Sequence, residues 1–179
     1  MTVSSDPLAD LRELHAAVDA KVAELSALHA GRLQCARGCA GCCQDDLSVF
    51  ALEAERIRAE AGQLLREGAP HPPGACAFLD NEGACRIYAA RPYVCRSQGL
   101  PLHWLEEREG QVVELRDICP LNEPEDQAPL EELALESCWP IGPVEARLRE
   151  LQAAHEPETP LRRVRLRDLF GDGPPRLGA

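Results

Sequence analysis

The most constraining feature of this sequence is a run of nine residues that contains four cysteines. Residues 35–43 read Cys-Ala-Arg-Gly-Cys-Ala-Gly-Cys-Cys. Thiols this crowded either ligate a metal ion or cluster, or pair as disulfides. Cys39 and Cys42 have the spacing most common for paired thiolate ligands in zinc and iron–sulfur sites. Gly38 and Gly41 precede them, and glycine permits the close backbone approach that a loop around sulfur ligands needs.

The cysteine count and the N-terminal sequence both bear on the redox compartment. The 179 residues include nine cysteines, and an odd number cannot pair completely within one chain. Residues 1–21 show no basic segment followed by an apolar one, so no secretory signal is visible. No apolar run approaches the roughly 18 residues of a membrane span. We therefore expect a cytoplasmic protein, in which cysteines are more often ligands or catalysts than disulfides. A thiol-redox protein without metal is the alternative that these features disfavour.

The charge of the chain indicates which partners to expect. The formal net charge is −11, whereas a protein that recognises phosphates presents a basic surface. The basic segment 162–167 is most simply a solvated strand or helix face. We expect no nucleic-acid partner and no membrane partner, but an unidentified protein or redox partner.

A second group of cysteines lies further along the chain: Cys76, Cys85 and Cys95. Residues 80–83, Asp-Asn-Glu-Gly, are typical of a turn, and a hairpin of this length would bring Cys76 and Cys85 towards each other. Arg91 and Arg96 flank Cys95. Their guanidinium groups would offset the negative charge of a thiolate site and donate hydrogen bonds to sulfur. The alternative is that both arginines form ordinary pairs with carboxylates.

The remaining sequence predicts a mainly α fold with a short β-hairpin. Apolar residues recur at three- or four-residue spacing from residue 6 to residue 30, which predicts an amphipathic helix. Ser48 is the predicted N-cap of a second helix, 49–67. Further helices are predicted at 129–138 and 143–155, and short strands at 76–79 and 112–115. We expect one small, loop-rich domain over residues 1–170, organised around a cysteine-bound metal centre, and a disordered tail at 171–179.

Four segments together form a specific pattern: Cys35-x3-Cys39-x2-Cys42-Cys43, the helix start Leu52-Glu53-Ala54-Glu55-Arg56-Ile57, the hairpin from Cys76 to Cys85-Arg-Ile-Tyr88, and Arg91-Pro92-x2-Cys95-Arg96. In this pattern the chain resembles the YkgJ-type cysteine-cluster family, also called the CxxCxxCC or zinc- or iron-chelating domain, over roughly residues 35–120. The resemblance implies a metal- or iron–sulfur-binding protein. A related cysteine cluster accompanies flagellin lysine methylases, so a protein-modification context is compatible with it. The metal ligands that it implies are Cys35, Cys39, Cys42, Cys43, Cys76, Cys85, Cys95 and Cys119.

Two cofactors fit these eight thiols. They could ligate two zinc ions, or one 4Fe–4S cluster with thiols to spare, since tetrahedral all-sulfur ligation suits both metals. We expect an iron–sulfur cluster used in redox or protein-modification chemistry. The alternative is a structural zinc module that acts as a protein-interaction adaptor. Outside the cysteines no catalytic arrangement is visible, so no reaction is predicted, and Cys138 is expected to be an idle or buried thiol.

Overall fold

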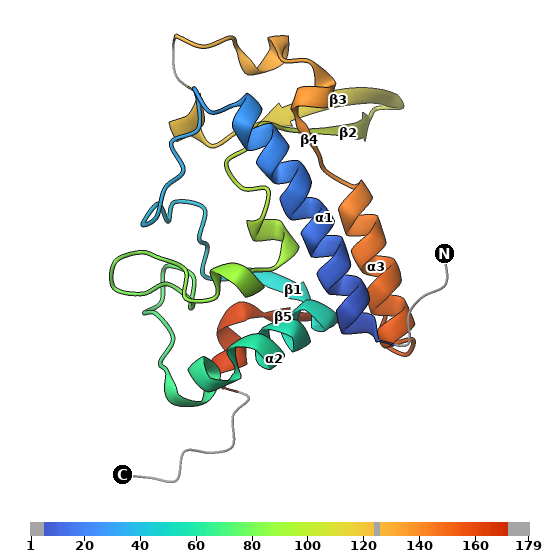
Figure 1. Ribbon diagram of the computed structural model, residues 1–179. Coiled ribbons are helices and arrows are strands. Elements are labelled where there is room, and N and C mark those ends of the chain that lie inside the picture. Colours follow the sequence, from blue (N-terminus) through green and yellow to red (C-terminus); the bar gives the residue numbers. More distant parts are fainter. Residues whose placement is uncertain (1–5, 124–125, 172–179) are drawn as a thin grey trace. The chain divides into compact units, whose positions relative to one another are not determined.

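The computed structural model describes residues 6–123 and 126–171 (Figure 1). The α-helices in this part of the chain are α1 Pro7–Leu28, α2 Ala51–Glu67 and α3 Pro143–His155. The strands are β1 Ser48–Phe50, β2 Leu102–Arg108, β3 Gln111–Asp117, β4 Trp139–Pro140 and β5 Arg163–Arg165. Short 3-10 turns lie at Tyr88–Ala90, Tyr93–Cys95, Pro120–Asn122, Leu130–Glu132, Leu135–Ser137 and Leu166–Phe170.

The prediction of a mainly α fold is wrong. Helical residues of both kinds make up 44% of the structure and strands 15%, in two small sheets. One cause is the segment 129–138, which was predicted as a helix but forms two 3-10 turns. The Arg116 guanidinium donates hydrogen bonds to the carbonyl oxygens of Leu130 and Leu133, at 2.8 and 2.6 Å, and so binds groups that an α-helix would use internally.

The second cause is the hairpin of β2 and β3, of which the sequence predicted only the strand at 112–115. Arg108 pairs with Gln111, so the connecting loop has two residues. These residues, Glu109 and Gly110, have φ angles of 53° and 77°. Positive φ at both positions matches a turn whose twist suits antiparallel strands. The sequence analysis predicted no turn at residues 109–110, and so it missed the long antiparallel pairing of β2 and β3 that this turn permits.

By its internal contacts the described chain divides into two compact units. Unit 1 comprises residues 6–12, 36–92 and 148–171, and unit 2 comprises residues 13–35, 93–123 and 126–147. Helices α1 and α3 each contribute residues to both units. The single domain expected over residues 1–170 stays a prediction. The predicted disordered tail lies outside the described residues apart from Gly171.

Unit 1 is built on helix α2 and the short sheet of β1 and β5, which lie side by side in Figure 1. Ser48 does not cap α2 as predicted, because Ser48–Phe50 pairs with Arg163–Arg165 instead. The helix begins after Phe50, whose backbone N–H donates to the Glu53 carboxylate at 3.3 Å. The apolar core of the unit joins α2 to the segment around Cys76, and its members are Val49, Ala54, Ile57, Leu65, Cys76, Phe78, Leu79, Ile87, Ala90, Leu166 and Leu169.

Unit 2 contains most of α1 and the sheet of order β3-β2-β4. The predicted first helix is confirmed, and its apolar residues Val18 and Leu25 are buried. Trp139 of β4 is also buried, and its indole N–H donates to the Tyr93 hydroxyl at 3.0 Å. Across residues 6–123 and 126–171 no helix combines the length and the apolar character needed to cross a bilayer.

Candidate metal centre

The eight cysteines predicted as ligands divide between the two units. Unit 1 holds Cys39, Cys42, Cys43, Cys76 and Cys85, and unit 2 holds Cys35, Cys95 and Cys119. All nine cysteines lie in the described part of the chain, and all are free thiols there. Cys138, the one cysteine not predicted as a ligand, is buried in unit 2.

In unit 1 the cysteine loop lies against the turn at residues 80–83. Gly38 has a φ angle of 89°, and a Cβ placed on Gly83 would lie 3.1 Å from the Gly38 carbonyl oxygen. The backbones of the two segments therefore approach so closely that a side chain at Gly83 or Gly38 would crowd the opposite segment. Such a close approach was the role expected for Gly38. Gly41 has no comparable neighbour, since a Cβ there would meet no atom within 4 Å. The arrangement supports a steric role for Gly38 and none for Gly41.

Backbone hydrogen bonds connect the cysteine loop to the segment that carries Cys76 and Cys85. The N–H of Cys76 donates to the Cys43 carbonyl oxygen at 2.9 Å. The predicted strand at 76–79 is reduced to a single bridge between Leu79 and Cys85. Asp80 closes the turn between them by accepting hydrogen bonds from the backbone N–H groups of Glu82 and Ala84. The hairpin therefore places Cys76 and Cys85 on neighbouring arms, as the sequence predicted.

The thiols of unit 1 differ in how readily they ionise. A hydrogen bond with the Cys43 side chain lowers the pKa of Cys42 to about 6, and partial burial opposes this effect. Burial raises the pKa of Cys76 and that of Cys85, although nearby arginine charges act in the opposite direction. The thiol on the exposed loop therefore forms a thiolate most easily, whereas the two thiols packed into the apolar core need a positive charge nearby.

The structure places Arg91 and Arg96 in different surroundings. The Arg91 guanidinium lies 4.0 Å from the centre of the Tyr88 ring, and its charge favours the thiolate of Cys85. Arg96 is buried and pairs with Asp19 of helix α1. Arg96 thus has the carboxylate partner that the sequence reading kept as its alternative. A role for either arginine beside Cys95 stays a prediction.

In unit 2 the side chain of Asn122 contacts the Cys35 sulfur. Its Nδ2 group donates to Cys35 Sγ at 3.3 Å and to the Gly99 carbonyl oxygen at 2.8 Å, and its Oδ1 accepts from the Gln34 N–H at 2.8 Å. The Asn122 N–H also donates to the carbonyl oxygen of Cys119 at 2.7 Å. The sequence predicts Cys119 as a ligand but gives no role to Asn122. The sequence feature that could have indicated a role for Asn122 is its position three residues after Cys119, a predicted ligand.

Arg167 is a second residue whose role the sequence did not reveal. Its guanidinium pairs with Asp45, just after the cysteine loop, and donates to the carbonyl oxygens of His71, Pro72 and Ala75, just before Cys76. The segment 162–167 was predicted to be a solvated face, which describes the exposed Arg163 and Arg165 but not Arg167. Arg167 therefore holds together two loops that carry predicted ligands.

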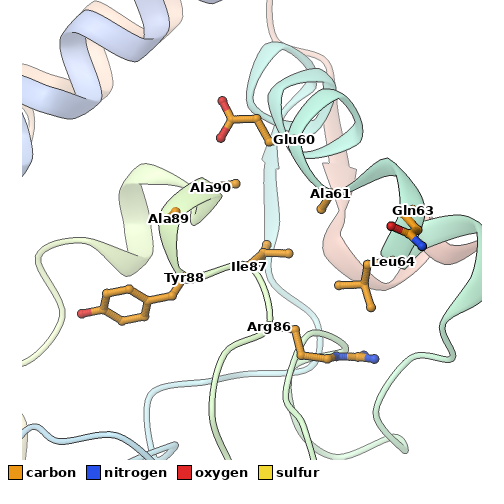
Figure 2. Close-up of a pocket in the computed structure, with 9 residues that line it drawn as sticks. All are labelled: Glu60, Ala61, Gln63, Leu64, Arg86, Ile87, Tyr88, Ala89 and Ala90. Atoms are coloured by element: carbon orange, nitrogen blue, oxygen red, sulfur yellow. The ribbon is translucent and has the colours of Figure 1, made fainter.

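A shallow pocket of about 340 Å³ opens in unit 1 between α2 and the residues that directly follow Cys85 (Figure 2). Its lining combines apolar side chains such as Leu64 and Ile87 with the carboxylate of Glu60 and the guanidinium of Arg86. Arg86 donates to the carbonyl oxygens of Ala69 and Ala77, and so holds the pocket wall rather than presenting a free charge.

Thiol groups are suitable donors for a soft metal, but their sulfur atoms within each described unit do not lie close enough together to share one. Within each unit, no three cysteine sulfurs of the described chain lie within 4.8 Å of one another. The one group of three possible ligands within that distance in the described residues is Glu55, His155 and Glu156. Their contacts are those of an ion-pair network, since His155 pairs with Glu55 and Glu156 with Arg162. Thiolates remain the donors that suit zinc and iron.

These features define a class of protein in which crowded thiols on a glycine-containing loop and an adjoining hairpin chelate a metal. The family model described as "CxxCxxCC: Putative zinc- or iron-chelating domain" matches residues 34–120. This match confirms, over that segment, the predicted resemblance to the CxxCxxCC family. Metal binding is confirmed at the level of zinc or iron chelation. No curated protein and no solved structure shows significant similarity to the chain.

Proposed function

We propose that this protein holds an iron–sulfur cluster of the 4Fe–4S type through its cysteines and acts with a protein redox partner, in electron transfer, redox sensing or protein modification. The observation that carries the proposal is the thiol count of one compact unit. Unit 1 alone supplies five cysteines, on the loop at 39–43 and the arms of the adjoining hairpin. Four thiolates suffice for such a cluster, so unit 1 offers one more than it needs.

The surroundings of these thiols suit a redox centre. When bound, an iron–sulfur cluster supplies one-electron chemistry whose potential depends on burial, charge and hydrogen bonds to sulfur. Cys76 belongs to the apolar core of unit 1, and Cys43 and Cys85 pack against it. These side chains would keep water from one side of the site, while Arg91 supplies positive charge beside Cys85. A reducing compartment, the cytoplasm, is part of the proposal because cysteines must stay reduced to ligate the cluster.

One observation favours the alternative, a structural zinc module that binds another protein. In the hairpin of unit 2, Leu105 and Val112 are 68% and 69% exposed. The strand register places them on the same face, because Leu105 pairs with Glu114 and Val112 with Glu107. An exposed apolar pair on a sheet is a possible contact for a protein partner.

Metal analysis of protein purified without oxygen tests both functions. We expect about four iron atoms and four acid-labile sulfides per chain, together with the visible charge-transfer absorbance of iron bound to sulfur. The double variant Cys76→Ser/Cys85→Ser leaves unit 1 with three of its five cysteines and should lose iron, whereas the control Cys138→Ser should keep it. Colourless protein with one or two zinc ions per chain would replace the proposal with the zinc module. Protein that is stably folded and free of both metals would contradict both.

A further inference from the structure

The amide of Asn122 is held in one orientation by its neighbours. The side chain is buried, with no exposed surface. Its oxygen accepts from the Gln34 N–H, which can only donate, and its nitrogen donates to the Gly99 carbonyl, which can only accept. Exchanging the amide oxygen and nitrogen would break both bonds. The group that faces Cys35 Sγ at 3.3 Å is therefore an N–H donor.

Gly99 forms the other wall around the same sulfur. Its φ angle is 93°, in the left-handed region that favours glycine. A Cβ on this residue would overlap Cys35 Sγ and would lie 3.1 Å from Asn122 Nδ2. The sulfur therefore occupies space that any side chain at position 99 would fill. Asn122 and Gly99 together confine the Cys35 sulfur from two directions.

From this geometry we propose that Asn122 is a positioning residue for Cys35 as a metal ligand. Its N–H···S hydrogen bond fixes the direction in which the sulfur is presented. Groups that bond to metal ligands in this way commonly change metal affinity by 10–100-fold when they are replaced. The inference rests on the proposed metal binding and on the ligand role that the sequence predicts for Cys35.

A double-mutant cycle tests the inference with Zn²⁺ as the probe and a competing chelator to measure affinity. Asn122→Asp keeps the size of the side chain and its acceptor for Gln34, but removes the donor to the Cys35 sulfur and to the Gly99 carbonyl oxygen. We expect it to weaken zinc binding about tenfold or more in the otherwise native protein, and to have little further effect in a Cys35→Ser background. The matched control is Gln152→Glu, which changes an equally buried amide that bonds to Leu52 and Glu156. This control should leave zinc affinity nearly unchanged.

The outcomes separate the inference from the function on which it rests. If Cys35→Ser leaves zinc affinity and stoichiometry unchanged, Cys35 is not a ligand, and the inference fails while metal binding by the thiols of unit 1 stands. If Cys35→Ser weakens binding but Asn122→Asp does not, the inference alone fails. An equal loss from Asn122→Asp in both backgrounds means general structural damage and overturns the positioning role.

A second measurement needs no substitution and so does not depend on whether a variant folds. In ¹⁵N-labelled native protein loaded with ¹¹³Cd²⁺, the Asn122 Nδ2 protons can be observed directly. We expect one of them to show scalar coupling to the cadmium nucleus, transmitted through the N–H···S hydrogen bond and the Cys35 sulfur. Cadmium-bound protein in which neither Asn122 proton shows this coupling would overturn the inference.

Discussion

In both units, single polar side chains bond to the backbone of segments that are distant in the sequence. Asn122 bonds to residues 34 and 99 in unit 2, and Gln152 accepts a hydrogen bond from the Leu52 N–H at 2.9 Å in unit 1. Both amides are fully buried. A buried polar group without a hydrogen-bond partner is costly in free energy. Each of these amides therefore specifies where the backbone segment that it bonds to must lie. The same requirement makes the cysteine positions sensitive to residues that are not cysteines.

Glu60 leads to a prediction about pH at the scale of one residue. Burial by itself opposes its ionisation, but hydrogen bonds from Arg56 and Arg12 outweigh this effect and lower the pKa of Glu60. Because the folded-state pKa lies below the unfolded-state value, the stabilisation is fully present above the unfolded-state pKa. It is lost as the pH falls through the folded-state pKa. We therefore expect Glu60→Gln to destabilise the protein in urea at pH 7, and the difference from native protein to shrink on acidification below about pH 4.

The exposed Glu67 provides the control, because Gln63 is the partner of its carboxylate and carries no charge. Glu67→Gln should have a smaller effect at neutral pH. A Glu60→Gln effect that is as large at pH 3 as at pH 7 would show that the ion pairs do not account for it.

At the scale of elements, the hairpin that carries Cys76 and Cys85 depends on the aromatic side chain between them. Phe78 is fully buried in the core of unit 1 and lies 5.0 Å from the Phe170 ring, centre to centre. That contact joins the hairpin to the 3-10 turn at Leu166–Phe170, which includes Arg167, the arginine that holds the cysteine loop. Packing in the core and placement of the thiols are thus properties of the same few residues.

Replacing Phe78 should therefore affect both stability and metal binding. Phe78→Ala should lower the free energy of unfolding of the metal-free protein by about 3–5 kcal/mol, because it removes a large buried side chain and leaves a cavity. It should also weaken metal binding, because Cys76 and Cys85 lose the support between them. Urea unfolding and chelator competition would measure the two effects. Tyr88→Ala, at an aromatic residue that is 65% exposed, is the control with little expected loss of stability. A Phe78→Ala protein as stable as that control would refute this account of the core.

For the molecule as a whole, metal ligation should contribute to folding. The chain has only 4% aromatic residues, which limits the apolar surface available to its core, and a metal that binds only the folded form stabilises it. We expect complete removal of the metal by a chelator to unfold at least residues 35–95. Circular dichroism and thermal melting would detect the loss, and limited proteolysis would locate new cleavage sites. Adding the metal back should restore protection. Unchanged circular dichroism and melting after complete removal would contradict this expectation.

Local patterns in the sequence determined several features correctly. The spacing of apolar residues predicted the helices at Pro7–Leu28 and Pro143–His155, because the pattern of a helix face is complete within the helix itself. The turn residues 80–83 predicted the hairpin arms of Cys76 and Cys85 for the same reason. The crowded cysteines indicated zinc or iron chelation, which the family match over residues 34–120 confirms.

The tertiary structure decided what depends on contacts between distant residues. Ser48 is a strand residue rather than a helix cap because Arg165, more than one hundred positions later, pairs with it. Cys35 and Cys39 are neighbours in one motif yet belong to different units, and Asn122 contacts the Cys35 sulfur from 87 positions away. No periodicity or spacing records such pairings, because each becomes favourable only when the rest of the fold has brought the two segments together. The sequence by itself therefore determined the chemistry of the ligands, and the tertiary structure decided which residues surround each of them.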